Sequence, residues 1–261
     1  MRRRPGLFVP VPRGQRIGLG IAFFVLFVTM WWLLTASGAV PPQFLASPLQ
    51  TLTAAWELFA KFNFGHDVGM TIWRVVGGFL LAAVIAVPLG IAMGAWKPVE
   101  AFFEPFVSFA RYLPASAFVP LLILWVGIGE SQKLAVIFLG CFFQLTLMIT
   151  MIVSGTRRDL VEAAYTLGST QGGIVRHVLL PGAAPEIAEA LRQVLGLGWT
   201  YIIVAELIGA SSGIGHMITD SQALMATENI ISGIVVIGLV GLVTDLLFKH
   251  ANRKLFAWSY L

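Results

Sequence analysis

The stretch Val75-Val-Gly-Gly-Phe-Leu-Leu-Ala-Ala-Val-Ile-Ala-Val-Pro-Leu-Gly-Ile-Ala-Met-Gly-Ala-Trp96 contains no charged side chain. It is longer than the roughly 20 apolar residues that a helix needs to cross a bilayer. The whole chain has the same character, because 57% of its 261 residues are hydrophobic and 11% are charged, whereas soluble domains carry about 25% charged residues. We therefore predict a protein of the lipid bilayer, without a large soluble domain.

Five further segments are apolar over a similar length. Together they predict an all-α, polytopic membrane protein with six transmembrane helices, at residues 17–34, 75–96, 112–129, 134–156, 185–209 and 229–244. The predicted domains are a tail at 1–16, a transmembrane domain at 17–248 and a tail at 249–261. The single cysteine, Cys141, lies inside an apolar segment and excludes an internal disulfide or a cysteine cluster that binds a metal.

The basic residues predict how the chain is oriented. If the N-terminus is cytoplasmic, all of the seventeen Lys and Arg residues except Lys61, Arg74 and Lys133 fall on the cytoplasmic side, as the positive-inside rule requires. This predicts N-in and C-in, with the 1–16 and 249–261 tails in the cytoplasm. The net charge of +4 then reflects topology and does not indicate a nucleic-acid partner. The first span follows Arg2, Arg3 and Arg4 but lacks a small-residue cleavage site, so we expect a retained anchor.

Two segments on the outer side are too short to span. Ser47-Pro48 predicts a helix start, with serine as the N-cap and proline at the first helical position. Leu49, Leu52, Trp56 and Phe59 follow at helical spacing, which predicts a short amphipathic helix at the outer surface. Residues 209–227 are rich in Gly and Ser, and we expect a re-entrant or a surface-lying segment there.

The longest cytoplasmic connection follows Arg157. In it Glu162-Ala163-Ala164 is followed after three residues by Gly168, and after nine more by Val178, Leu180 and Pro181.

Charges in this connection suit two short helices. Acidic Asp159 and Glu162 lie near the start of the first, and basic Arg176 and His177 lie near the end of the second, where the helix dipoles favour them. Gly168 permits a sharp turn between the two helices. This pattern predicts a compact knob that docks on another protein.

The spacing resembles the coupling motif of bacterial ABC-importer permeases. Arg111–Glu130, Ala205–Gly215 and Phe44–Pro48 are similar to the nitrate/sulfonate/taurine branch of that family. The resemblance implies the type I ABC importer (MetI-like) permease fold and a place in the bacterial cytoplasmic (inner) membrane. It also implies a second permease copy in a homodimer, two ATPase subunits and an extracytoplasmic substrate-binding protein. The ATPase-coupling residues in loop 157–181 would be Glu162, Ala163, Ala164, Gly168, Leu180 and Pro181.

Nucleotide binding is expected elsewhere. A phosphate-binding loop needs Gly-Lys-Ser/Thr, and none of the five lysines follows a glycine. We therefore expect no catalysis and no cofactor in this chain, with ATP and Mg used by a partner subunit.

Candidate residues of the translocation path follow from polar groups in or near spans. Arg111, Tyr112, Pro114 and Ser116 form one set, because Pro114 interrupts a helix next to an arginine. Arg111 could equally be a structural ion-pair partner. Glu206 could line a gate or be a satisfied interfacial carboxylate, and we expect Arg74 to extend to the outer interface.

The substrate is expected from the resemblance alone. It implies a small anion, sulfonate- or taurine-like ahead of nitrate or bicarbonate. The sequence departs from that branch at Gln144, where relatives often have proline, so the resemblance does not fix the substrate.

Two alternative functions and one question of helix packing remain open at this point. The chain could be an autonomous secondary transporter or channel, which predicts inverted repeats that we do not find. It could be a membrane enzyme, since Gly209-Ala-Ser-Ser-Gly213 matches the nucleophile pattern Gly-x-Ser-x-Gly, with His216 and Asp220 nearby. Finally, Gly90-Ile-Ala-Met-Gly94 allows close helix packing, within one subunit or between two.

Overall fold

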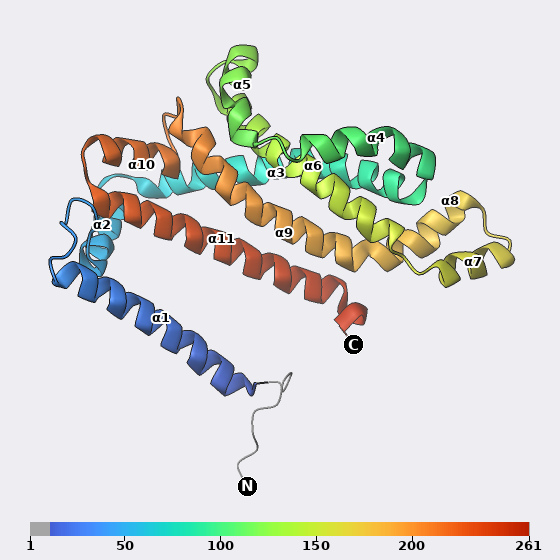
Figure 1. Ribbon diagram of the computed structural model, residues 1–261, viewed down its shortest axis with the longest axis horizontal. Coiled ribbons are helices and arrows are strands. Elements are labelled where there is room, and N and C mark those ends of the chain that lie inside the picture. The colour runs from blue at the N-terminus through green and yellow to red at the C-terminus, as the bar shows by residue number, and fades with distance from the viewer. Residues whose placement is uncertain (1–10, 261) are drawn as a thin grey trace, which may run out of the picture.

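The computed structural model describes residues 11–260, and every regular element in these residues is helical, as predicted (Figure 1). Among them, five long helical segments are apolar enough to cross a membrane. They contain α1 (Arg13–Ala36), α3 (Phe64–Ala95), α6 (Glu130–Ser154), α9 (Leu180–Leu207) and α11 (Thr227–Leu255). Arg2, Arg3 and Arg4 lie outside the described residues.

The short helices gather at the two ends of the bundle. α2 (Pro48–Lys61) and α10 (Ile214–Ala223) lie at one end, which we call the α10 end. α7 (Arg158–Thr166) and α8 (Gln171–Ile174) lie at the other, which we call the loop end (Figure 1). The start of α1 and the end of α11 both point toward the loop end.

The third predicted helix, 112–129, is wrong in detail. The chain forms α4 (Lys97–Ala110), a turn, the 3₁₀ turn η1 (Ala115–Phe118) and α5 (Val119–Val126), and the two halves are bent by 84°. Pro114 causes the break, because proline has no N–H and disfavours helical backbone in the residue before it. Eight residues of α5 extend only about 12 Å, so α5 alone does not cross a bilayer. The described residues hold five candidate spans, or six if the bent pair counts as one.

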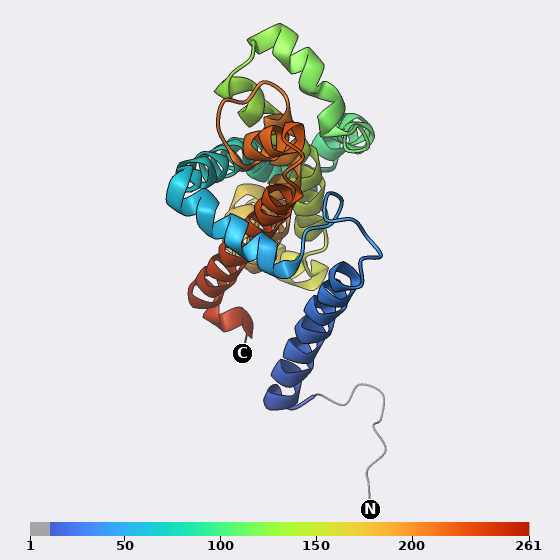
Figure 2. The ribbon, with the colours of Figure 1, turned by 90° about the vertical axis from the view of Figure 1, so that its left-hand side faces the viewer.

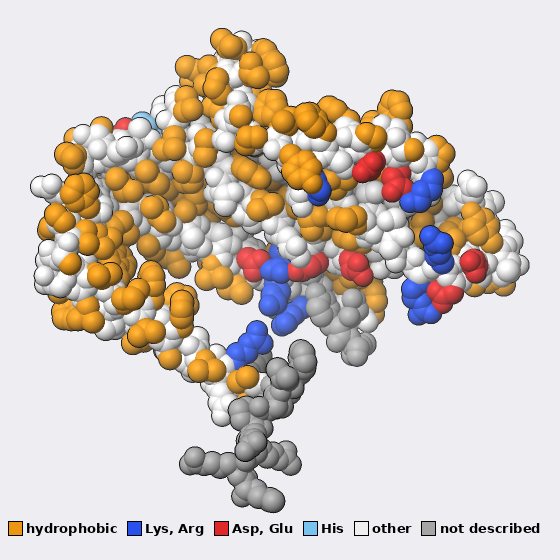
Figure 3. Space-filling view, viewed as in Figure 1, with side chains coloured by type: hydrophobic (Ala, Val, Ile, Leu, Met, Phe, Trp, Pro, Cys, Tyr) orange, Lys and Arg blue, Asp and Glu red, His pale blue; other side chains and the backbone are white. Residues whose placement is uncertain are grey.

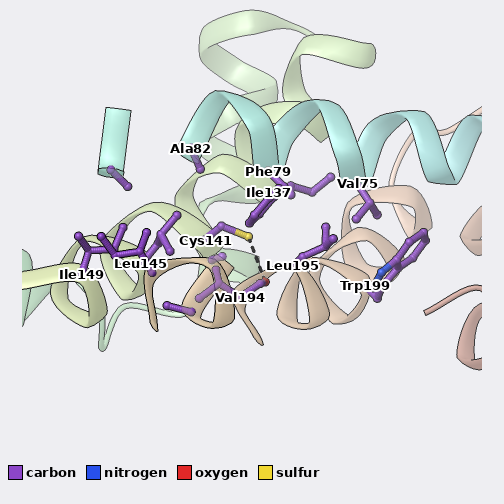
Figure 4. Close-up of a cluster of buried hydrophobic side chains, with 14 of the residues drawn as sticks. Val75, Phe79, Ala82, Ile137, Cys141, Leu145, Ile149, Val194, Leu195 and Trp199 are labelled. Atoms are coloured by element: carbon purple, nitrogen blue, oxygen red, sulfur yellow. Dashed lines mark hydrogen bonds between the residues drawn. The ribbon is translucent and has the colours of Figure 1, made fainter. Parts of the chain in front are cut away.

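The core forms where α6 lies between α3 and α9 (Figure 4). Val75 and Phe79 from α3, Ile137 and Leu145 from α6 and Val194 from α9 meet there, each at most 4% exposed. Cys141 is fully buried among them, and its Sγ lies 3.8 Å from the carbonyl oxygen of Val194. The predicted role of Cys141 as a small apolar side chain agrees with this position.

Glycines on α3 let α6 approach closely. A Cβ on Gly90 would lie 2.8 Å from the carbonyl oxygen of Thr146, and one on Gly94 would lie 2.6 Å from Cβ of Val153. The small-residue pattern of α3 therefore packs within one subunit.

The N-terminal helices lie at the edge of the bundle. α1 stands apart and meets the rest through α2 (Figure 2), and Trp31 Nε1 donates a hydrogen bond to the carbonyl of Ala46 at 3.0 Å. α2 begins with the predicted Ser47 cap, in which Ser47 and Gln50 bond reciprocally to each other's backbone N–H. Its apolar face points away from the bundle, since Trp56 is 75% exposed. The predicted amphipathic helix is confirmed.

The glycine-rich segment folds into α10. This helix has ten residues, about 15 Å, and packs on α9 and α11 with Ile214 and Met217 buried. Gly209 and Gly213 before it have φ of +67° and +112°, in the region that favours glycine. The segment is therefore a short helix held against the end of the bundle.

Candidate functional site

The loop between α6 and α9 projects from the bundle as a helical hairpin (Figure 1). The chain reverses at Gly168, whose φ is +82°. Ser169 N–H donates to the carbonyl of Ala164 at 3.0 Å and Gly168 N–H to that of Tyr165 at 2.9 Å, the pattern of a helix that ends in glycine. The turn predicted at Gly168 is confirmed.

The second half of the hairpin differs from the prediction. α8 does not end at Arg176 and His177 but continues through a π-helical segment, η2 (Val175–Leu179), into α9. Leu180 N–H donates to the carbonyl of Val175, five residues back. Pro181 has no N–H to continue the regular pattern, which explains the wider turn just before it. Residues 171–207 thus form one continuous helical rod.

The predicted coupling residues divide by exposure. Glu162, Ala163, Gly168 and Pro181 are exposed, and Leu180 is half-buried. Ala164 is only 8% exposed and packs against this chain's own core, so it holds α7 in place.

Apolar side chains that the motif did not single out are exposed on the same hairpin. Leu167 is 86% exposed, and Tyr165 and Leu160 are also exposed. On the face shown in Figure 3, charged side chains gather at the loop end and near the end of α11, whereas the α10 end is almost free of them. Arg157 pairs with Asp159 in this hairpin, and this hydrogen bond holds the pKa of the Asp159 carboxyl below its usual range.

Four of the predicted path residues come together. Arg111, Tyr112, Pro114 and Ser116 line a hollow of about 290 Å³ between the α4–η1 turn, α6 and α9. Arg111 Nη2 donates a hydrogen bond to the Tyr112 hydroxyl at 2.8 Å, and its guanidinium lies 4.7 Å from the centre of that ring. The described residues offer Arg111 no carboxylate partner within 4 Å, so the expected structural ion pair is not formed.

Glu206 lies elsewhere, in a buried ion cluster at the α10 end. Arg74 is fully buried there, which makes its expected position at the outer interface wrong. Arg74 Nη1 donates to Glu206 at 2.7 Å, and Nε and Nη2 donate to the two oxygens of Glu130, each at 2.7 Å. Arg74 also donates to the carbonyl and the hydroxyl of Ser212.

The same cluster fixes the start of α10. Thr71 Oγ1 donates to both carboxylate oxygens of Glu206 and accepts from Ile214 N–H at 2.9 Å. Gly215 N–H donates to Glu206 at 2.9 Å, and Gly213 N–H to Asp67 at 2.7 Å. Glu206 is therefore satisfied, but it is buried in the protein and not at an interface.

A hydrolase site is absent from the described residues around Gly209–Gly213. These residues lie between two helices and not on the strand-to-helix turn that the nucleophile pattern needs. His216 pairs with Asp220 along one helix at 3.4 Å, and within the described residues no hydrogen bond joins either of them to Ser211, the central serine of the pattern.

The geometry defines a class of protein. A chain with five or six apolar spans, a projecting helical hairpin at one end and a hollow lined by an arginine between the α4–η1 turn, α6 and α9 has the architecture of a membrane transport subunit. The family described as "Binding-protein-dependent transport system inner membrane component" matches residues 86–257, and the chain belongs to this family.

Curated relatives cover nearly the whole chain. It is 30% identical over 252 residues to the taurine transport system permease protein TauC of Escherichia coli, covering 95% of this chain and 92% of that protein. It is 32% identical over 240 residues to the putative aliphatic sulfonates transport permease protein SsuC of Bacillus subtilis, covering 92% and 87%. It is 28% identical over 253 residues to the nitrate import permease protein NrtB of Synechocystis, covering 94% and 90%.

Solved structures support the same fold. An inward-facing structure of the MetNI methionine ABC transporter matches with a TM-score of 0.66 at 20% identity, covering 73% of this chain and 95% of that chain. A bacterial ABC transporter that imports alginate matches with a TM-score of 0.55 at 15% identity, covering 93% and 97%.

The predicted class is therefore confirmed. The chain is a multi-pass permease subunit of an ATP-driven importer with the MetI-like fold. Membership of this family excludes the two alternative classes, an autonomous transporter and a membrane enzyme.

Proposed function

We propose that this permease forms the translocation path for a small anion, sulfonate- or taurine-like ahead of nitrate or bicarbonate. An extracytoplasmic binding protein delivers the anion, and two copies of the chain pair as a homodimer around the path. Two ATPase subunits dock on loop 157–181 and use ATP and Mg, while this chain binds no cofactor. The taurine, sulfonate and nitrate permeases among its relatives support the class of substrate.

The exposure of the hairpin is the observation that supports the proposed contact with the ATPase subunits. Leu167 is 86% exposed at its tip, next to Gly168. Together with the exposed side chains of Tyr165 and Leu160, it forms a group of apolar side chains on a charged hairpin, which suits burial by another protein. Glu162, Ala163 and Pro181 are also exposed, so the contact uses the exposed members of the motif. Ala164 instead packs into the core of this chain and holds α7 in place.

The orientation follows from the same hairpin. If the ATPases bind at the loop end, that end is cytoplasmic. The start of α1 and the end of α11 point the same way, which supports N-in and C-in (Figure 1). Tags at the N-terminus, at Lys61, within 157–181 and at the C-terminus should then report inside, outside, inside and inside, and protease cleavage of 157–181 from the outer face would contradict this.

The test replaces Gly168 by valine. A β-branched residue at φ +82° is strained by about 1–3 kcal/mol, enough to displace the hairpin tip. Gly168→Val should insert normally but lose the co-purifying ATPase subunit or uncouple ATP hydrolysis from uptake.

Gly65→Val is the matched control. Gly65 is exposed at the far end of the bundle, has open space around its Cβ position and has no positive φ. Normal uptake and normal ATPase retention in Gly168→Val would contradict the docking role of the hairpin.

A further inference from the structure

The hollow beside Arg111 has the composition of a small binding site. Its walls come from the α4–η1 turn, from Leu139, Gly140, Phe143 and Gln144 on α6, and from Leu197 and Tyr201 on α9. A volume of about 290 Å³ lies at the lower limit of ligand pockets, which begin near 300 Å³. It suits a ligand of few heavy atoms.

The charge in the hollow is of one sign. Arg111 is the single ionised side chain among the residues that line it. A guanidinium has five N–H donors, of which the described residues engage one, through Nη2 to Tyr112. The guanidinium carbon lies 4.7 Å from the centre of the Tyr112 ring, and the remaining donors have no partner among the described residues. The geometry favours an oxyanion.

Uncharged polar groups face the same hollow. Gln144 and Tyr201 are half-buried, Ser116 is exposed, and none of the three side chains has a hydrogen-bond partner within the described part of the chain. Gly140 makes room for one of them, because a Cβ there would lie 2.4 Å from Cδ2 of Tyr201. The Tyr201 ring is thus seated against the backbone of α6.

We propose that this hollow is a transient binding site for a small oxyanion within the path. Arg111 attracts the anion, and Gln144 and Tyr201 donate the hydrogen bonds that select it. The inference rests on the proposed function, and it adds a position and a set of selecting residues. Because Arg111 is exposed, the site binds weakly, as a path requires if the anion is also to leave.

One experiment measures the local potential without knowledge of the substrate. In the assembled transporter, with the partner subunits free of cysteine, Ser116→Cys is labelled with an anionic sulfonatoethyl methanethiosulfonate and with its cationic trimethylammonium counterpart. Cys141 is fully buried and contributes little background. The anionic reagent should react at least tenfold faster than the cationic one, after correction for their rates with free cysteine.

Two variants locate the source of that preference. Adding Arg111→Gln or Gln144→Glu should reduce the rate ratio at least fivefold. Thr53→Cys, exposed on α2 far from the hollow, is the reference site and should keep its ratio in both backgrounds. A ratio at Ser116→Cys that neither change affects would overturn the proposal.

Transport supplies the second measurement. Uptake of taurine, methanesulfonate and nitrate is measured in vesicles with saturating binding protein. Gln144→Glu should lower the initial rate at least tenfold while ATPase retention stays normal, and Arg111→Lys should retain more of the rate than Arg111→Gln. Gln222→Glu makes the same chemical change on the exposed side of α10 and should behave like the unmodified chain.

The two measurements distinguish a failure of this proposal from a failure of the proposed function on which it rests. Gln144→Glu importing at the rate of Gln222→Glu would overturn the site and leave the anion path intact. A charge-dependent labelling ratio without uptake of taurine, methanesulfonate or nitrate would support the site and overturn the proposed substrate class.

Discussion

The buried cluster around Arg74 gives the sharpest prediction of stability. Among the described residues, Arg74 is the one cation that contacts both Glu206 and Glu130, and Arg74→Gln removes it. Glu206 has no exposed side-chain surface, whereas the Glu130 side chain is 45% exposed. The two carboxylates therefore respond differently to the loss of Arg74.

The magnitude follows from this difference in burial. Breaking a buried pair by removing one partner costs about 3–5 kcal/mol, because an uncompensated charge remains in a poor solvent. An ion pair that water reaches contributes about 0–1 kcal/mol. Arg74→Gln should thus lower the free energy of unfolding by about 3–5 kcal/mol, and Glu130→Gln by less than about 1 kcal/mol.

The chain carries its own reporter for the assay. Cys141 is the single cysteine and is fully buried, so a thiol-reactive fluorescent dye labels it only on unfolding. In a domain of this size 1 kcal/mol corresponds to about 2–4 °C in Tm, which predicts a fall of roughly 6–20 °C for Arg74→Gln. The double variant Arg74→Gln/Glu206→Gln leaves no unpaired buried charge and should regain part of that loss.

Two outcomes would contradict the role of the buried Glu206 charge. If Arg74→Gln melts within about 4 °C of Glu130→Gln, burial of Glu206 does not set the cost. If the double variant is no more stable than Arg74→Gln, the uncompensated charge is not its origin.

Three further substitutions test local packing by the same thermal assay. Gly90→Ala should destabilise the chain by about 1–3 kcal/mol, because its Cβ would lie 2.8 Å from Cβ of Ile149 on α6; an unchanged Tm would show that α3 and α6 separate easily. Ser47→Ala removes a capping side chain and should cost about 1 kcal/mol. Gly213→Ala should cost more than Ser47→Ala, because φ is +112° and the new Cβ would lie 2.5 Å from Cδ of Glu206; equal melting temperatures would contradict the close approach.

Much of the fold could be predicted because the signals are local. Uninterrupted apolar runs mark the long helices, and Ser47-Pro48 marks the start of α2 within its own few residues. Gly168 could be predicted as a turn for the same reason, since the need for positive φ depends only on the neighbouring backbone. The prediction of one span at 112–129 was wrong although Pro114 marked an interruption, because hydropathy does not register a bend of 84° or show that the first half of the bent pair is 97–110.

The role of Arg74 could not be predicted because its partners are distant. Glu130 lies 56 residues and Glu206 lies 132 residues further along the chain. An arginine beside Trp73 at the end of an apolar run has the same local pattern as one at a membrane interface. Tyr201 could not be predicted for a similar reason, and Gln144 stood out only as a departure from related permeases, because only tertiary packing brings these two residues to Arg111.

The arrangement connects the hairpin to the Arg74 cluster through two helices. α6 begins at Glu130 and ends just before the hairpin, while residues 171–207 run as one rod from the hairpin to Glu206. Packed helices move as rigid elements, because their cores are too dense to deform gradually. A displacement that tilts α6 against this rod therefore changes the distance between Glu130 and Glu206. Because Arg74 bonds to both carboxylates, such a tilt must break one of these bonds or shift the Arg74 side chain. Gln144 on α6 and Tyr201 on α9 lie between these ends, so the same tilt alters the width of the hollow.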